Sequence, residues 1–421
     1  MVSDRRNLNL FTLSFTALLV GQVISILGDR LNNIAMIELI AVETGRFHRA
    51  GSAFELSKLA LAMTLPSLVL GPLIGAYVDR ASRKRVLVTS DVVRGLAVVA
   101  IPFLRPALPM WTVYGVIAFL YLANLFFLPA RCAVVAEIVE RESLLRANSL
   151  LSLGATVATI VGFGLGGLVV THIGWRPAFI IDAITYFLSA ASLAMLAPTG
   201  RASERPGQGT SYAGMIREAL GQVRHLAGAR MGVLVPPLLT AAGTVAYVLG
   251  VALVESHSAR GTMWVGFLIS LAGAGMALGC YLTGRLFHGA SREKVAFGAA
   301  VTSVAALALA ALARNFVAVG LAATAAGIAA GPVLVVSETA IQEEAAARRQ
   351  ATVFAVRDML MKLGAAVAAI AAPAVAALLG LGPAMAVLLG LLAVPLGLLA
   401  WLPRPRGLRT GGREPGTPRS E

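Results

Sequence analysis

Long uninterrupted runs of apolar residues constrain the fold of this 421-residue chain more than any other feature. Many runs exceed eighteen residues, the length that a helix needs to cross a bilayer, and they lack the alternating pattern of barrel strands. Charged residues make up only 13% of the chain, whereas a soluble domain carries about 25%. The outer surface must therefore meet lipid, where helices satisfy the backbone. We predict an all-α membrane protein.

The apolar runs divide into two sets of six. The first set covers 11–41, 53–77, 86–104, 110–129, 148–171 and 176–196, and the second covers 231–254, 262–283, 295–313, 316–337, 351–379 and 383–402. The intervening polar stretch is rich in Gly, Ser, Arg and Pro and then takes the pattern of a short amphipathic helix. We predict four parts: an N-terminal half 1–197, a cytoplasmic linker 198–230, a C-terminal half 231–403 and a disordered basic tail 404–421.

The two halves look like copies of one unit. The second span is followed by GPLIGAYVDRASRKRVL and the eighth by LGCYLTGRLFHGASREKV. Both segments leave the membrane through glycine, aromatic and aliphatic residues into a short basic loop. Internal repeats of this kind are common in transporters.

Basic residues set the expected orientation. The chain carries 35 Lys and Arg residues and a net charge of +14, concentrated in the two termini, the linker and alternate loops. This is the positive-inside pattern, so we expect both termini in the cytoplasm. The basic residues would then face anionic lipid headgroups, and we expect no nucleic-acid partner. We also expect a monomer.

One short basic loop carries a motif. The segment Gly75-Ala-Tyr-Val-Asp79-Arg80-Ala-Ser-Arg83-Lys84-Arg85 resembles the signature loop of the major facilitator superfamily, with Ser82 in place of its second glycine. The resemblance implies a fold of twelve spans in two halves. It also implies that Asp79 and the basic residues hold the halves together at the cytoplasmic side, with Asp79 at the N-terminus of the eleventh helix. The expected partners of this gate are Asp91, Arg94, Glu137, Glu338, Arg357 and Asp358.

Longer segments narrow the resemblance. The run FLPARCAVVAEIVERESLLRANSLLSLGATVATIVGFGLGGLV and the later IDAITYFLSAASL resemble bacterial exporters of the macrolide-efflux and enterobactin type. The run SILGD, ending at Asp29, resembles lysophospholipid transporters. These likenesses imply a bacterial inner-membrane protein and proton-coupled efflux of a hydrophobic or amphipathic small molecule. The chain departs from drug–proton antiporters in two respects, because its fourth span lacks an internal arginine and Phe163 replaces an expected proline.

Charges and glycines inside the spans supply the site candidates. A buried charge costs roughly 2.5 kcal/mol or more in a membrane helix, so it must face a cavity or a partner. Asp29 is a candidate for proton or cation coupling or for a structural ion pair, and Asp182 for coupling or a hydrogen bond between helices. Gly162, Gly166 and Gly167 are expected to allow close helix packing. In the superfamily the first, fourth, seventh and tenth spans line the cavity, which makes cavity candidates of Asn33, Asn124, Phe126 and Tyr247.

Other classes of protein are less well supported. The sequence has no Gly-Lys pair of a phosphate-binding loop, no zinc-protease motif and no nucleophile elbow. It has only two cysteines and no metal-ligand spacing, so we expect no cofactor or metal. We predict a secondary transporter driven by an ion gradient rather than an enzyme. The alternatives are a lysophospholipid transporter of the same superfamily and a non-transporting membrane sensor or scaffold.

Overall fold

The computed structural model describes residues 12–45, 49–78, 82–140, 143–197, 227–257, 261–286, 291–313, 315–344 and 350–401. Twelve helices in these ranges are long and apolar enough to cross a membrane. The predicted all-α fold with twelve spans is therefore confirmed. Asp79, Arg80, the predicted amphipathic helix of the linker and the tail 404–421 lie outside the described residues.

Each half supplies six of these spans. The N-terminal half consists of α1 (Leu13–Glu43), α2 (Arg49–Val78), α3 (Arg83–Leu104), α4 (Met110–Ile138), α5 (Leu144–Ile173) and α6 (Trp175–Ala194). In the C-terminal half, the seventh span is built from α8 (Ala227–Val245), a π-helical turn η2 (Ala246–Gly250) and α9 (Val251–His257). The remaining spans are α10 (Gly261–Leu286), α11 (Arg292–Leu312), α12 (Phe316–Glu344), α13 (Gln350–Leu379) and α14 (Leu381–Trp401).

The packing of the helices repeats from one half to the other. In the N-terminal half the pairs in contact include α1 with α5 and α6, α3 with α6, and α4 with α2 and α3. The equivalent pairs, with the seventh span in place of α1, are also in contact in the C-terminal half. Both fifth spans also meet their sixth at a glycine with positive φ, Gly174 at 81° and Gly380 at 84°. Only glycine adopts this conformation without strain, so the same tight turn recurs at the same place.

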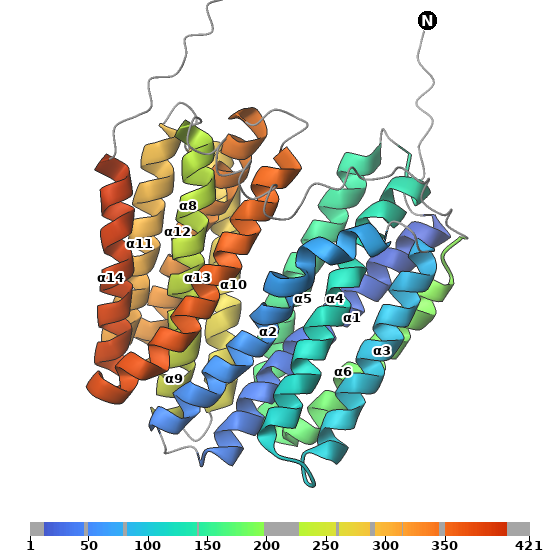
Figure 1. The fold of residues 1–421 in the computed structure, drawn as a ribbon, viewed down its shortest axis with the longest axis horizontal. Helices are drawn as coiled ribbons and strands as arrows, with labels where there is room; N and C mark the ends of the chain where they lie inside the picture. The colour runs from blue at the N-terminus through green and yellow to red at the C-terminus, as the bar shows by residue number, and fades with distance from the viewer. Residues whose placement is uncertain are drawn as a thin grey trace, which may run out of the picture.

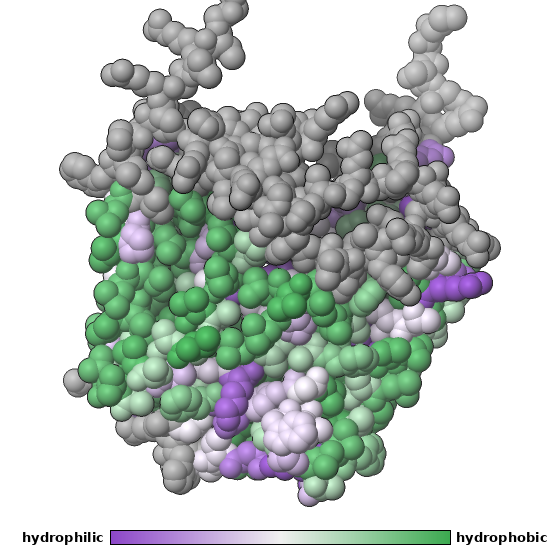
Figure 2. All heavy atoms as spheres, viewed as in Figure 1, coloured by the Kyte–Doolittle hydropathy of each residue, from purple (hydrophilic) through white to green (hydrophobic). Residues whose placement is uncertain are grey.

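The two halves meet through two equivalent interfaces. α2 packs against α13, and α5 packs against α10, so the second span of each half contacts the fifth span of the other. Figure 1 shows the N-terminal bundle, in blue and green, packed beside the C-terminal bundle, in yellow to red. Apolar side chains cover much of the outer face in Figure 2. Large examples are Phe103, Trp111 and Leu378, each at least 70% exposed.

The core is continuous at one end of the molecule and divided at the other. We name the ends by their connections: the α1–α2 end and the α2–α3 end. A large apolar cluster contains residues of both halves, such as Ile34 and Phe179 with Val251 and Val265. Near the α2–α3 end two smaller clusters each belong to one half, the first around Leu18, Leu87, Val134 and Leu193 and the second around Val233, Ile341, Val353 and Val356. The halves are thus joined by apolar packing mainly toward the α1–α2 end.

Candidate functional site

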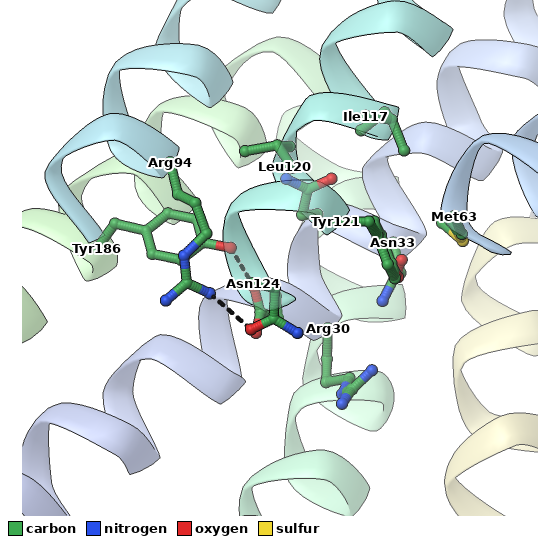
Figure 3. A pocket seen from close by; sticks show the side chains of 11 residues that line it. Arg30, Asn33, Met63, Arg94, Ile117, Leu120, Tyr121, Asn124 and Tyr186 are labelled. Carbon is green, nitrogen blue, oxygen red and sulfur yellow. Dashed lines mark hydrogen bonds between the residues drawn. The ribbon is translucent and has the colours of Figure 1, made fainter. Parts of the chain in front are cut away.

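A polar cavity of about 120 Å³ lies within the N-terminal bundle. Side chains from α1, α2, α3, α4 and α6 line it (Figure 3), namely Asp29, Arg30, Asn32, Asn33, Met63, Arg94, Ile117, Leu120, Tyr121, Asn124 and Tyr186. Three of these, Asp29, Asn33 and Asn124, are sequence-predicted site residues that the fold brings together. Arg94, an expected partner of the gate, also lines the cavity.

Asp29 connects the first and sixth spans. The hydroxyl of Tyr186 donates a hydrogen bond to Asp29 Oδ1, and Figure 3 shows a dashed line leaving this hydroxyl. Both side chains line the cavity. Asp29 is therefore a carboxylate at the surface of a polar cavity, and its stabilising partner comes from a different helix.

Arg94 contacts side chains of three helices, α3, α4 and α6. Its guanidinium pairs with Asp91 one turn earlier on α3 and donates from Nη1 to Asn124 Oδ1 at 3.3 Å. The Ser189 hydroxyl donates to the other oxygen of Asp91 at 2.6 Å. The rings of Phe127 and Tyr186 lie 4.8 and 4.6 Å from the guanidinium carbon. The charge of Arg94 is thus balanced inside the N-terminal half, with the pairing that its spacing from Asp91 predicts.

Asp182 is fully buried and is not among the residues that line the cavity. Its Oδ2 accepts a hydrogen bond from Asn32 Nδ2 at 2.6 Å, and Thr185 Oγ1 lies 3.3 Å from its Oδ1. Gly28 packs against this group so closely that an added Cβ would overlap Asp182 and Thr185. Asp29 and Asn32 line the cavity whereas Asp182 does not, so Asp29 has the more direct access to it.

The predicted close-packing glycines of α5 lie against two helices. An added Cβ would stand 2.8 Å from Arg30 Cβ at Gly162 and 3.5 Å from Leu31 Cα at Gly166. At Gly167 it would stand 2.8 Å from the carbonyl oxygen of Met263 on α10. These glycines allow α5 to pack closely between α1 of its own half and α10 of the other.

Two aromatic candidates lie elsewhere. Phe126 packs against the apolar cluster at the α2–α3 end of the N-terminal half. Tyr247 lies in the π-helical turn, packed against the large shared cluster, and neither residue is among those that line this cavity. The role of Phe126 and Tyr247 as cavity residues stays a prediction.

Several ion pairs between described residues at the α2–α3 end lie within one half. Arg83 pairs with Glu137, and Lys84 Nζ donates to the carbonyl oxygen of Leu196 at 2.6 Å. In the C-terminal half, Arg357 lies 3.8 Å from Glu338, and Lys362 pairs with Asp358 at 2.5 Å. Gly75 lies in the last turns of α2. The gating role of this region stays a prediction, because Asp79 and Arg80 lie outside the described residues.

A polar bridge crosses between the halves at the α1–α2 end. Thr262, at the start of α10, donates a hydrogen bond to Glu38 of α1 and lies 2.7 Å from Glu255 Oε1 of α9. All three residues are buried. Nearby, an added Cβ at Gly266 would stand 2.5 Å from the carbonyl oxygen of Phe163 and 2.8 Å from Gly167 Cα. The halves therefore touch backbone to backbone here.

Sequence reasoning missed part of the cavity wall. Arg30, Tyr121 and Tyr186 were not proposed as site residues. Tyr186 lies 157 positions from the Asp29 that it contacts. No local spacing links residues that far apart. A signal was available for Tyr121, because it lies one turn before Asn124 on the predicted fourth span and therefore on the same helix face.

Known proteins resemble the chain along most of its length. Uncharacterized MFS-type transporter YfiS of Bacillus subtilis is 30% identical over 276 residues, which are 64% of this chain and 63% of that protein. Macrolide efflux protein A of Streptococcus pyogenes is 26% identical over 190 residues, 45% of each chain. Lysophospholipid transporter LplT of Cronobacter sakazakii is 26% identical over 225 residues, 53% of each chain. The matched region is less than two thirds of each relative.

Solved structures share the fold. A bacterial homologue of the human lysosomal transporter Spinster aligns with a TM-score of 0.67 at 16% identity, covering 93% of this chain and 95% of that one. Nucleoside transporter NupG aligns with a TM-score of 0.71 at 12% identity, covering 92% and 100%. The family profile described as Major Facilitator Superfamily matches residues 18–369. The chain belongs to the major facilitator superfamily of transporters.

Proposed function

We propose that this transporter exports a hydrophobic or amphipathic small molecule across the bacterial inner membrane in exchange for protons. The observation that carries the proposal is Asp29, a carboxylate that lines the cavity and contacts Tyr186 of another helix. The efflux names among the relatives support the direction of transport. Both termini and the α2–α3 end are assigned to the cytoplasm, as the positive-inside pattern indicates.

The division of the core supports alternating access. Apolar packing joins the halves toward the α1–α2 end, while each half has its own cluster at the α2–α3 end. The conformation therefore corresponds to a carrier closed on its outer side. Transport requires the halves to rock about the site so that the closed end opens.

Asp29 is assigned the role of proton carrier and Asp182 that of a positioning residue. A coupling carboxyl must exchange protons with the aqueous cavity, and Asp29 lines it whereas Asp182 does not. When Asp29 is protonated it loses its charge, which weakens its hold on Tyr186 and lets α1 and α6 rearrange. Asp182 fixes the position of Asn32 in the cavity wall.

The test is flux in proteoliposomes, with ethidium and a fluorescent macrolide as export probes and an imposed pH gradient. We expect gradient-driven flux in the unaltered protein and at least a tenfold lower rate in Asp29→Asn. The matched control is Glu43→Gln, because Glu43 pairs with Arg105 at the end of the bundle, outside the cavity. Gradient-driven flux that Asp29→Asn leaves unchanged would refute the coupling role.

Lysophospholipid transport is the second candidate. The resemblance to lysophospholipid transporter LplT extends over 53% of the chain, more than the 45% matched by macrolide efflux protein A. Transfer of a labelled lysophospholipid between leaflets, without gradient-driven flux of the drug probes, would favour it. If neither activity appears under any ion gradient, a sensor or scaffold is the better description.

A further inference from the structure

We propose that the cavity binds the anionic group of an amphipathic substrate, a carboxylate or a phosphate, and that Arg30 is the residue that holds it. The proposal deepens the proposed function by naming the substrate class of the same cavity. It comes from a difference between the two arginines that line the wall, Arg30 and Arg94.

The charge of Arg94 is balanced and that of Arg30 is not. Arg94 has Asp91 as an ion-pair partner and Asn124 as an acceptor. Among the described residues, no carboxylate forms an ion pair with Arg30, and its buried Nε has no hydrogen-bond partner. The dashed lines of Figure 3 reach Arg94 but not Arg30. An uncompensated cation at this depth is costly, so an anion from outside the chain would stabilise it.

The acids around the cavity are already engaged elsewhere. Asp29 accepts from Tyr186, Asp91 pairs with Arg94, and Asp182 accepts from Asn32. Among the described residues, none of these carboxylates forms an ion pair with Arg30. A guanidinium presents paired N–H donors that match a carboxylate or phosphate, which makes an anion its natural partner.

The rest of the surroundings suit a head group with an apolar body. The guanidinium carbon of Arg30 lies 5.3 Å from the centre of the Phe163 ring, which supports the arginine from one side. Asn33 and Tyr121 supply further donors, and Met63 and Leu120 supply apolar wall. The volume of about 120 Å³ admits a compact polar group, whereas whole drug-sized ligands occupy roughly 300–1,000 Å³. The apolar body would therefore extend beyond the cavity.

Arg30 also lies beside the interface that has to rearrange. Gly162 of α5 packs against Arg30, and Gly167 one and a half turns later packs against α10 of the other half. An anion on Arg30 therefore acts on the helix that forms part of the contact between halves. Occupancy of this site and movement of α5 are expected to be coupled.

The experiment compares two fluorescent probes that differ in charge and by one methyl group. The purified full-length protein in nanodiscs is titrated with 11-(dansylamino)undecanoate and with its methyl ester, and dansyl fluorescence reports binding without any gradient. We expect the carboxylate to bind at least tenfold more tightly than the ester. Equal affinity of the two probes for the unaltered protein overturns the proposal without requiring any variant to fold.

Variants then locate the charge preference. Arg30→Gln is expected to weaken carboxylate binding at least tenfold while ester binding changes less than twofold, and Arg30→Lys should restore part of the loss. Arg105→Gln is the control, because Arg105 pairs with Glu43 at the α1–α2 end and does not line the cavity. A carboxylate preference that survives Arg30→Gln would overturn the role of Arg30.

Competition separates the two sources of such an anion. Displacement of the dansyl probe by lysophosphatidate, but not by inorganic phosphate at equal concentration, supports the amphipathic substrate. Equal displacement by inorganic phosphate overturns the amphipathic part of the proposal. Since binding is measured without a gradient, charge-selective binding without flux refutes only the proposed function. Flux without charge selectivity refutes only this inference.

Discussion

Asp91 and Arg94 form a charged pair in the interior of the N-terminal half, with both side chains at most 3% exposed. Breaking a buried pair leaves an uncompensated charge, which costs about 3–5 kcal/mol, whereas replacing both partners by apolar residues costs far less. The rings of Phe127 and Tyr186 lie against the guanidinium, so a methionine at this position would keep apolar contacts with them. Removing one partner should therefore destabilise the protein far more than replacing both.

The prediction at this scale is a double-mutant cycle. Asp91→Leu alone should lower the thermal unfolding midpoint markedly, because Arg94 then lies buried without a counter-charge. The double variant Asp91→Leu/Arg94→Met should recover most of the loss. The measurement is the unfolding midpoint of the purified protein in detergent by intrinsic tryptophan fluorescence. Additive effects of the two substitutions would show that the pair is not coupled.

Local spacing sets how much of the site could be predicted from the sequence. Asp91 and Arg94 are three positions apart on one helix, so their pairing follows from helical geometry. Asn32 and Asp182 are 150 positions apart, and the contact depends on how α1 and α6 cross. Spacing along a helix therefore predicts contacts within that helix. Contacts between helices that are distant in sequence depend on how the helices pack.

Among the helix pairs, α10 and α12 approach each other through glycines. An added Cβ would overlap the carbonyl oxygen of Ile328 at Gly279 and that of Ala272 at Gly327. At Gly331 it would overlap the backbone of α10, within 2.7 Å of the carbonyl oxygen of Met276. Small residues at such crossings let the backbones pack directly. The resulting van der Waals contacts stabilise the helix pair, because the hydrophobic effect does not drive association inside a membrane.

The close packing of α10 against α12 predicts that one added methyl group lowers the stability of the protein by an unusually large amount. Gly279→Ala should destabilise the C-terminal half by about 1–3 kcal/mol, because the backbone of α12 has to move. Gly298→Ala is the control, because Gly298 is exposed on α11 with no atom within 4 Å of an added Cβ. It should be neutral or slightly stabilising, since alanine favours the helix. Urea-induced unfolding in detergent, or loss of a fluorescent-protein fusion signal on heating, gives the comparison. Equal effects of both changes would contradict the close approach.

Hydropathy predicted the spans well and their internal breaks poorly. The predicted seventh span, 231–254, is a single apolar run, and the structure divides it into α8, a π-helical turn and α9. Gly250 is the last residue of the turn, but a single glycine within an apolar run does not by itself predict a π-helical turn. Tyr247 lies within this turn, so a regular helical face does not predict its orientation.

For the whole molecule, the six-plus-six division was readable from hydropathy and from the polar linker. The pairing of the second span of each half with the fifth of the other was not, because it depends on how two separate bundles dock. Which end of the two bundles is closed could likewise not be predicted from the sequence. The closure depends on close contacts such as those between Gly167 on α5 and Gly266 on α10.

These contacts predict a shift of the conformational equilibrium. Gly266→Ala should push α5 and α10 apart and favour molecules that are open at the α1–α2 end. Spin labels on Leu108→Cys and Leu378→Cys, at that end of the two halves, with Cys132 and Cys280 changed to serine, would report a longer mean distance by electron paramagnetic resonance. Gly243→Ala is the control, because an added Cβ there meets no atom within 4 Å. An unchanged distance distribution would show that this contact does not hold the end closed.

The large apolar cluster shared by both halves has a thermal consequence. If the α1–α2 end opens to water, part of this cluster becomes hydrated, and hydration of apolar surface raises the heat capacity. The equilibrium between the two states should therefore follow a curved temperature dependence, with cooling favouring the hydrated state as the hydrophobic contribution weakens. A transporter built in this way would change its resting orientation with the temperature at which its cell grows.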